Sequence, residues 1–279
     1  MNITLKRGIT GIFIIAVILA PILLTRLSPF IFIYILASLC CLTLMEYFDL
    51  LSVSNKGKPQ DTMGSITGIA LFLISSFIVF VKLPCVFLLL LIPLFLTVFG
   101  IELYRRTAEP ITNLAQTILG IIWIALPFGL YNFYFLPGLY SGDRHIPALA
   151  LFVFLWVNDT GAYLTGIAFG KRKLFERISP GKTWEGSAGG ILFTLITAFV
   201  VSFFWKGYTW QSWVVFGVIT AIAGTFGDLF ESLFKRNLGC KDSGNMIPGH
   251  GGFLDRFDSF LFAAPAVFVF MILKYLLNI

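Results

Sequence analysis

The sequence predicts an all-α polytopic integral membrane protein, a helical bundle of about nine transmembrane helices. Of its 279 residues, 58% are apolar and 12% are charged, whereas soluble domains are usually about one quarter charged. The charged residues leave charge-free runs close to the ~20 residues that a helix needs to cross the hydrocarbon core. A β-barrel is excluded, because its strands alternate in polarity over about 10 residues. The runs lie at 8–25, 27–45, 62–81, 83–101, 186–205 and 207–227.

Three further spans complete the predicted bundle, at 111–136, 148–170 and 259–278. The second of these contains Asp159, and no internal repeat or soluble terminal domain is evident. We therefore predict one membrane domain over 1–279, with five N-terminal helices in 1–147. The remaining part, 148–279, carries the two loops richest in charge, 171–187 and 235–258.

The basic residues predict how the bundle is oriented. They gather in alternate connections, and the richer set lies on the cytoplasmic side of a membrane protein. This places the N-terminus and both charged loops in the cytoplasm and the C-terminus outside. Because the basic residues sort by loop in this way, the net charge of +6 does not indicate nucleic-acid binding. The poorer set is Arg26, Lys82, Arg144, Lys206 and Lys274, one in each connection.

Half of the charged residues fall in two windows, 156–187 and 228–258, both on the predicted cytoplasmic side. Ionisable residues at membrane depth are costly unless they face a polar cavity, so this concentration favours a functional site over solvated loops. In the second window four polar residues recur at i, i+3, i+4 and i+7, which places them on one face of a helix end. They are Asp228, Glu231, Ser232 and Lys235.

The second window has the residue types of a metal and phosphate site. Mg²⁺ is typically held by one or two carboxylates plus substrate phosphates, and Asp228 and Asp255 could supply the two. The glycines of the P-G-H-G-G segment let backbone N–H groups approach an anion. Capping of the last helix could explain Asp258 or Ser259 by itself. Positive charge for a polyphosphate comes from Lys235, Arg236, Lys241 and Arg256.

The first window supports the same site. Asn158 and Asp159 lie in the middle of a predicted helix, where an aspartate needs a partner or an aqueous cavity, although a hydrogen bond between helices is the plainer explanation. The segment I-S-P-G-K-T-W-E-G then offers Ser179, Lys182 and Thr183 before a helix start. It contains G-K-T without the spacing of a Walker A loop. We interpret it as a phosphate-binding loop facing the membrane.

The stretch S-L-F-K-R-x4-K-D-S-G-x3-P-G-H-G-G-x-L-D-R-x-D-S, together with I-S-P-G-K-T-W-E-G and N-D-T-G-A-Y, resembles the signature of the phosphatidate cytidylyltransferase family. The resemblance covers about residues 150 to 260. It implies an integral membrane enzyme that condenses CTP with phosphatidic acid, releases pyrophosphate, forms CDP-diacylglycerol for phospholipid biosynthesis and requires Mg²⁺.

Carried over residue by residue, the resemblance suggests Asp228 and Asp255 as metal ligands and Lys235 beside them as a catalytic cation. It makes 148–279 the catalytic half. A second cation is compatible with a two-metal arrangement. Further substrate contacts are expected from Asp159, Ser179, Lys182, Thr183, Ser232, Arg236, Lys241, Asp242, His250, Arg256 and Asp258.

Two other functions share parts of this pattern. A CTP-using polyprenol or dolichol kinase would transfer a different group, and the combined K-D-S-G and G-H-G-G-x-L-D-R-x-D motifs disfavour it. A secondary transporter would have charged groups near the midplane and repeated halves. We expect an enzyme of a bacterial inner membrane, embedded in the bilayer with its site facing the cytoplasm. The 31 phenylalanines of the apolar bundle leave a homodimer open without requiring one.

Overall fold

The computed structural model describes residues 3–54, 57–244, 246 and 251–277, with the backbone alone for residues 3–10. In this described part, eight helices are long and apolar enough to cross a membrane, and Gly11–Leu24 is a shorter apolar stretch within helix α1. The predicted fold class, an all-α polytopic membrane protein, is confirmed. The chain divides into two compact units, Met1–Phe133 with Asn237–Arg256 (unit 1) and Tyr134–Arg236 with Phe257–Ile279 (unit 2).

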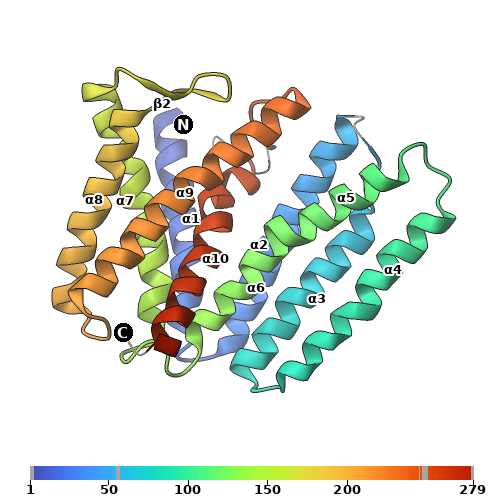
Figure 1. Ribbon diagram of the computed structural model, residues 1–279, viewed down its shortest axis with the longest axis horizontal. Helices are drawn as coiled ribbons and strands as arrows, with labels where there is room; N and C mark the ends of the chain where they lie inside the picture. The colour runs from blue at the N-terminus through green and yellow to red at the C-terminus, as the bar shows by residue number, and fades with distance from the viewer. Residues whose placement is uncertain (1–2, 55–56, 245, 247–250, 278–279) are drawn as a thin grey trace. The chain divides into compact units, whose positions relative to one another are not determined.

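Unit 1 is built mainly from the first half of the chain (Figure 1). Helix α3 packs against α2 and α6, and Pro29 and Pro110 begin α2 and α5, where the missing N–H costs no helical hydrogen bond. The helices are α1 (Ile3–Leu24), α2 (Pro29–Val53), α3 (Asp61–Phe80), η1 (Cys85–Leu90), α4 (Leu91–Tyr104), α5 (Pro110–Gly120), η2 (Ile121–Ala125) and α6 (Leu126–Asn132).

The predicted span 111–136 is a run of helical segments rather than one regular helix. Residues Ile121–Ala125 form a π-helical segment between α5 and α6. Pro127 stands two residues after it, in the first turn of α6. A proline inside a helix lacks the N–H donor and clashes with the carbonyl four residues earlier. The wider π turn accommodates this clash and lets the chain continue through the core without ending the span.

Unit 2 contains α7 (His145–Phe169), α8 (Trp184–Phe204), and most of α9 (Trp210–Leu238) and α10 (Leu254–Leu277). Helices α7 and α8 pack side by side, and a Cβ atom on Gly189 would lie 2.1 Å from the hydroxyl of Thr165, so only glycine allows this approach. Trp213 is fully buried in the core of the unit, with its indole ring against Phe154 and Phe216.

Both predicted loops are partly regular structure. The 171–187 segment forms an antiparallel hairpin of β1 (Lys173–Phe175) and β2 (Ser179–Thr183), in which Lys173 pairs with Thr183. Sequence reasoning missed it because proline and glycine within S-P-G-K-T are poor strand formers. The predicted loop 235–258 is also shorter than expected, since α9 continues to Leu238 and α10 begins at Leu254.

The orientation in the membrane stays a prediction, and cysteine labelling tests it. In a variant without the native cysteines, we expect Lys206→Cys, between α8 and α9, to react with a membrane-impermeant maleimide on intact cells. Lys173→Cys, on the exposed hairpin, should react only after permeabilisation. The reverse pattern would overturn the orientation predicted from the basic residues.

Candidate active site

The centre of the candidate site in unit 2 is an ion pair between Lys182 on β2 and Asp228 on α9. Their side chains are 25% and 33% exposed, so solvent and ligands can reach both. The hydroxyl of Ser232, one turn along α9, donates to Asp228 Oδ1 at 3.4 Å. The pair joins the two windows that the sequence singled out.

Two further aspartates lie around this ion pair. The charges of Asp228, Asp159 and Lys182 all act on the carboxyl group of Asp258 near the start of α10. The helices can approach there because residue 227 is glycine: a Cβ atom on Gly227 would lie 2.4 Å from the carbonyl oxygen of Asp258. The structure therefore brings together three of the predicted aspartates and one predicted lysine.

The charge balance of this cluster fits a divalent cation. The cluster contains three carboxyl groups and one ammonium group, and a hard cation with oxygen ligands would add positive charge beside the carboxylates. In the described ranges, no group of three or more His, Cys, Asp or Glu side chains has an arrangement that could hold a metal by itself. Mg²⁺ bound through one or two carboxylates and substrate phosphates does not need such a group.

Lys235 and Arg236, predicted as phosphate-binding cations, already contact protein groups. The ammonium of Lys235 lies 2.6 Å from the carboxylate of Glu231, which is buried at 1% exposure. The guanidinium of Arg236 donates to the carbonyl of Ile178 at 3.5 Å and connects α9 to the hairpin. Glu231 therefore accompanies Lys235 on the predicted polar face, and this ion pair limits the charge that Lys235 offers a ligand.

The residues before α8 have structural partners as well. The hydroxyl of Thr183 accepts the backbone N–H of Gly186 at 3.1 Å and caps α8, as the predicted helix start implies. Ser179 is half-buried in β2. In α7, Asn158 is buried, and no hydrogen bond to its side-chain oxygen is found in the described part of the chain. The hydrogen bond between helices considered for Asn158 and Asp159 is therefore not observed at this oxygen.

The other predicted site residues belong to unit 1. The carboxylate of Asp255 accepts the backbone N–H groups of Ser243 at 3.1 Å and Gly252 at 3.0 Å, so it closes the loop between α9 and α10. Lys241, Asp242 and Arg256 are exposed around this loop. His250 lies outside the described residues. Because Asp228 belongs to unit 2, its predicted sharing of one metal ion with Asp255 stays a prediction from the sequence.

Sequence reasoning missed Glu46, a buried carboxylate in the middle of α2. Its Oε1 accepts the hydroxyl of Ser243 at 3.1 Å, and its Oε2 accepts the backbone N–H of Leu254 at 2.8 Å. Glu46 therefore holds both ends of the loop whose carboxyl-terminal side carries Asp255. The available signal was an acidic residue within an apolar helix, where an uncompensated charge is expensive.

Two glycines of the signature motifs pack directly on Glu46. A Cβ atom would lie 2.1 Å from Glu46 Oε1 at Gly244 and 1.5 Å from it at Gly252. Any larger residue would displace the carboxylate or the loop. Both glycines are therefore explained first by packing on a buried acid, whereas for Gly252, in P-G-H-G-G, the sequence had suggested an anion-binding backbone.

The ion pair of Lys182 gives a direct mutational test. Lys182→Met keeps the length and apolar stem but removes the ammonium, and a half-exposed pair contributes only about 0 to 1 kcal/mol to stability. We expect Lys182→Met to leave the thermal unfolding midpoint unchanged and to raise the KM for CTP or for phosphatidic acid. Lys173→Met, on the neighbouring strand, is the control and should leave both KM values unchanged. Unchanged KM and kcat for Lys182→Met would make the hairpin a simple connector.

Comparison with known proteins identifies one family. The sequence model of the Cytidylyltransferase family matches residues 5–274, which is nearly the whole chain. The match includes all of the site residues described above, in both units.

Three similar proteins carry the name phosphatidate cytidylyltransferase. The one from Staphylococcus aureus (strain COL) is 47% identical over 126 residues, 44% of this chain and 48% of that protein. Staphylococcus haemolyticus has one that is 44% identical over 146 residues, 52% of this chain and 55% of the relative. The protein of Haemophilus influenzae is 44% identical over 132 residues, 45% and 46% of the two chains. The chain thus spans about half the length of the curated relatives it matches.

Proposed function

The chain belongs to the Cytidylyltransferase family, and from this premise we propose that it is a phosphatidate cytidylyltransferase, a nucleotidyltransferase of phospholipid biosynthesis. Its substrates would be CTP and phosphatidic acid, and its products CDP-diacylglycerol and pyrophosphate. The observation that carries the proposal is the Lys182–Asp228 ion pair with Asp159 and Asp258 beside it. The names of the three relatives support the choice of substrates.

The proposed reaction is a displacement at the α-phosphorus of CTP. An oxygen of the lipid phosphate forms the new P–O bond, and the bond to the β-phosphate bridging oxygen breaks with release of pyrophosphate. Both substrates are polyanions, so the site has to position them and offset their repulsion. Lys182 is suited to this task, because its ammonium is accessible and is held by Asp228.

Mg²⁺ is the proposed cofactor, and it would supply charge neutralisation on the nucleotide phosphates. Asp228 and Asp255 are the ligands that the family resemblance suggests. Asp228 is half-exposed beside Lys182, and the carboxylate of Asp255 accepts the backbone N–H groups of Ser243 and Gly252. A second cation would fit the additional carboxylates of unit 2.

We further propose a bacterial inner membrane as the location, with the site on the cytoplasmic side. CTP is soluble and phosphatidic acid is not, so they meet at the level of the lipid headgroups. The described helices support residence in a membrane, and the bacterial relatives support the bacterial location. The homodimer left open by the sequence is not part of this proposal.

The position of a radioactive label distinguishes the proposal from a CTP-using kinase. Detergent-purified protein is given phosphatidic acid, Mg²⁺ and CTP labelled at either the α- or the γ-phosphate. We expect lipid-extractable label from α-labelled CTP alone, with equimolar pyrophosphate. Label transferred from the γ-phosphate would indicate a kinase, and no transfer from either would contradict both enzymes. The variant Asp228→Asn measures the background.

A further inference from the structure

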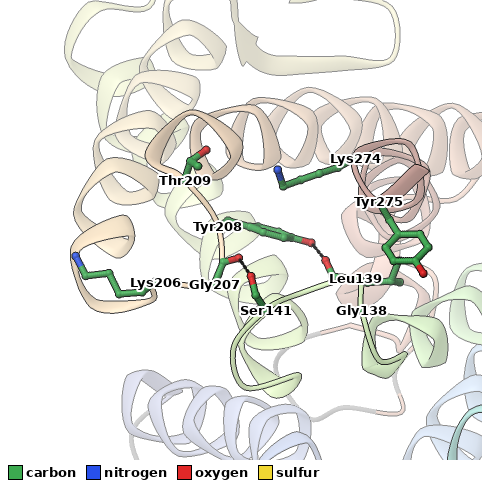
Figure 2. A pocket seen from close by; sticks show the side chains of 9 residues that line it. All are labelled: Gly138, Leu139, Ser141, Lys206, Gly207, Tyr208, Thr209, Lys274 and Tyr275. Carbon is green, nitrogen blue, oxygen red and sulfur yellow. Dashed lines mark hydrogen bonds between the residues drawn. The ribbon is translucent and has the colours of Figure 1, made fainter. Parts of the chain in front are cut away.

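Unit 2 has a second polar feature at the end opposite the β-hairpin. A cavity of about 510 Å³ lies between the segment before α7, the connection from α8 to α9, and the last turns of α10 (Figure 2). Its lining includes Lys206, Lys274, Tyr208 and Tyr275. None of these residues belongs to the proposed catalytic cluster, so the cavity requires its own explanation.

The cavity is held in shape by hydrogen bonds between its two loops. The hydroxyl of Tyr208 donates to the carbonyl of Leu139 at 2.5 Å, and the hydroxyl of Ser141 donates to the carbonyl of Gly207 at 2.6 Å (Figure 2). The N–H of Gly207 donates in turn to the hydroxyl of Tyr140 at 3.1 Å. Three such bonds make the cavity a preorganised structure, whereas a simple connector between helices would not need them.

Glycines at two positions open this space. Gly138 has a φ of +91°, a left-handed conformation that other residues rarely adopt. A Cβ atom on Gly207 would lie 2.2 Å from the ring of Tyr140. The rings of Tyr140 and Tyr208 meet edge to face, with centroids 4.8 Å apart. The two loops therefore pack against the aromatic rings of Tyr140 and Tyr208.

The lining of the cavity carries positive charge only. It contains two lysines and no aspartate or glutamate. Lys274 extends its ammonium over the ring of Tyr208, 5.5 Å from the centroid, as Figure 2 shows, while the ammonium of Lys206 points away from the cavity. Burial raises the pKa of Tyr208 above its usual range and also raises the pKa of Tyr140, so both phenols stay neutral at physiological pH.

The position of the cavity suggests what would fill it. It lies at the ends of α8 and α10, both of which qualify as membrane spans. Exposed apolar side chains on α10, namely Val269, Leu273 and Leu276, recur at i, i+4 and i+7 and so follow one face of the helix toward this end. A ligand with a charged head and apolar chains would match both the charge of the cavity and this apolar face, whereas a free anion would use only the charge of Lys274.

We propose that this cavity binds the phosphate headgroup of an anionic phospholipid. The ammonium of Lys274, over the ring of Tyr208, would supply the positive charge that meets its phosphate oxygens. The acyl chains would lie along the apolar face of α10. The charge count places this end of unit 2 on the non-cytoplasmic side, opposite the proposed catalytic loops. The site is independent of the proposed activity, so it remains testable if the chain does not use CTP.

Thermal unfolding of the purified full chain in nonionic detergent tests the proposal. Dihexanoyl phosphatidylglycerol, dihexanoyl phosphatidylcholine and inorganic phosphate are titrated separately. We expect the phosphatidylglycerol to give a saturable rise in Tm, because a ligand that binds only the folded state stabilises it. Lys274→Met should raise the apparent Kd about tenfold or more, the scale of one lost charge-assisted hydrogen bond. Lys274→Arg should restore binding.

The controls separate the lipid from other ligands. Lys82→Met removes a lysine predicted on the same side of the membrane but located in unit 1, and it should bind phosphatidylglycerol like the native protein. Equal binding by Lys274→Met and Lys82→Met would overturn the proposal. If inorganic phosphate gave an equal rise in Tm that also depended on Lys274, the cavity would be a site for free anions. If the phosphatidylcholine gave an equal rise in Tm, binding would not require a net negative charge on the lipid. Either result would overturn the assignment to anionic lipid.

Discussion

Asp228→Asn is expected to lower cytidylyl transfer by about two to four orders of magnitude, the scale at which removing a preorganised electrostatic group slows phosphoryl transfer. The substitution is nearly isosteric, so α9 and its packing should persist. It removes the negative charge that holds Lys182 and the anionic oxygen that Mg²⁺ prefers. Initial rates at several Mg²⁺ concentrations, with CTP and phosphatidic acid saturating, measure the effect.

A matched variant makes this result specific. Asp61→Asn alters an exposed aspartate in the first turn of α3, and it should change neither the rate nor the dependence on Mg²⁺. Combining Asp228→Asn with Lys182→Met should cost little more than Asp228→Asn alone, because the two side chains act as a pair. Turnover by Asp228→Asn close to that of the native protein at high Mg²⁺ would contradict the catalytic role.

Asp255→Asn is a less direct test than the sequence alone suggested. Its Oδ2 accepts the backbone N–H groups of Ser243 and Gly252, and its Oδ1 also faces the Ser243 N–H at 3.4 Å. The N–H₂ group of an asparagine side chain would therefore meet the Ser243 N–H in either orientation. The substitution would therefore disturb the loop as well as remove an anionic oxygen. For this reason we assign the decisive metal test to Asp228.

The second large effect is expected at Glu46, where Glu46→Leu should release the loop between Ser243 and Leu254. Leucine has a similar size and suits a membrane helix, but it leaves the Leu254 N–H and the Ser243 hydroxyl without their acceptor. A buried donor without a partner costs about 1 to 3 kcal/mol. We therefore expect hydrogen exchange of the Leu254 amide to accelerate about 10- to 100-fold, with a parallel loss of activity.

Glu46→Gln provides the graded comparison. Its amide can accept from Leu254 and donate to Ser243, so exchange should be only slightly faster than in the native protein. Glu102→Leu is the matched control, because Glu102 is equally buried but bonds Gln60, Asn113 and Arg105. Glu102→Leu should break the hydrogen bonds around position 102 and leave hydrogen exchange of the Leu254 amide as slow as in the native protein. If the Leu254 amide exchanged at the same rate in Glu46→Leu and in the native protein, Glu46 would have no role in positioning the loop.

The predictable part of the site is local in the sequence. Asp228 and Ser232 lie one helical turn apart on α9, and the structure finds them in hydrogen-bond contact, as their i, i+4 spacing implies. The same spacing brings Glu231 and Lys235 together. Thr183 caps α8, where G-K-T preceded an expected helix start. Each of these contacts depends on neighbours within a few residues, so periodicity and capping preferences suffice to predict them.

The sequence by itself determined the membrane spans and the residue types of the site, since an apolar segment in lipid must satisfy its backbone internally as a helix. Only the tertiary structure decided that Glu46 holds Ser243 and Leu254, about 200 residues away in the chain. It also decided which cation faces Asp228. A polar residue within an apolar run indicates that a partner exists. The identity of that partner depends on how helices distant in the sequence pack, and a local sequence pattern does not contain this information.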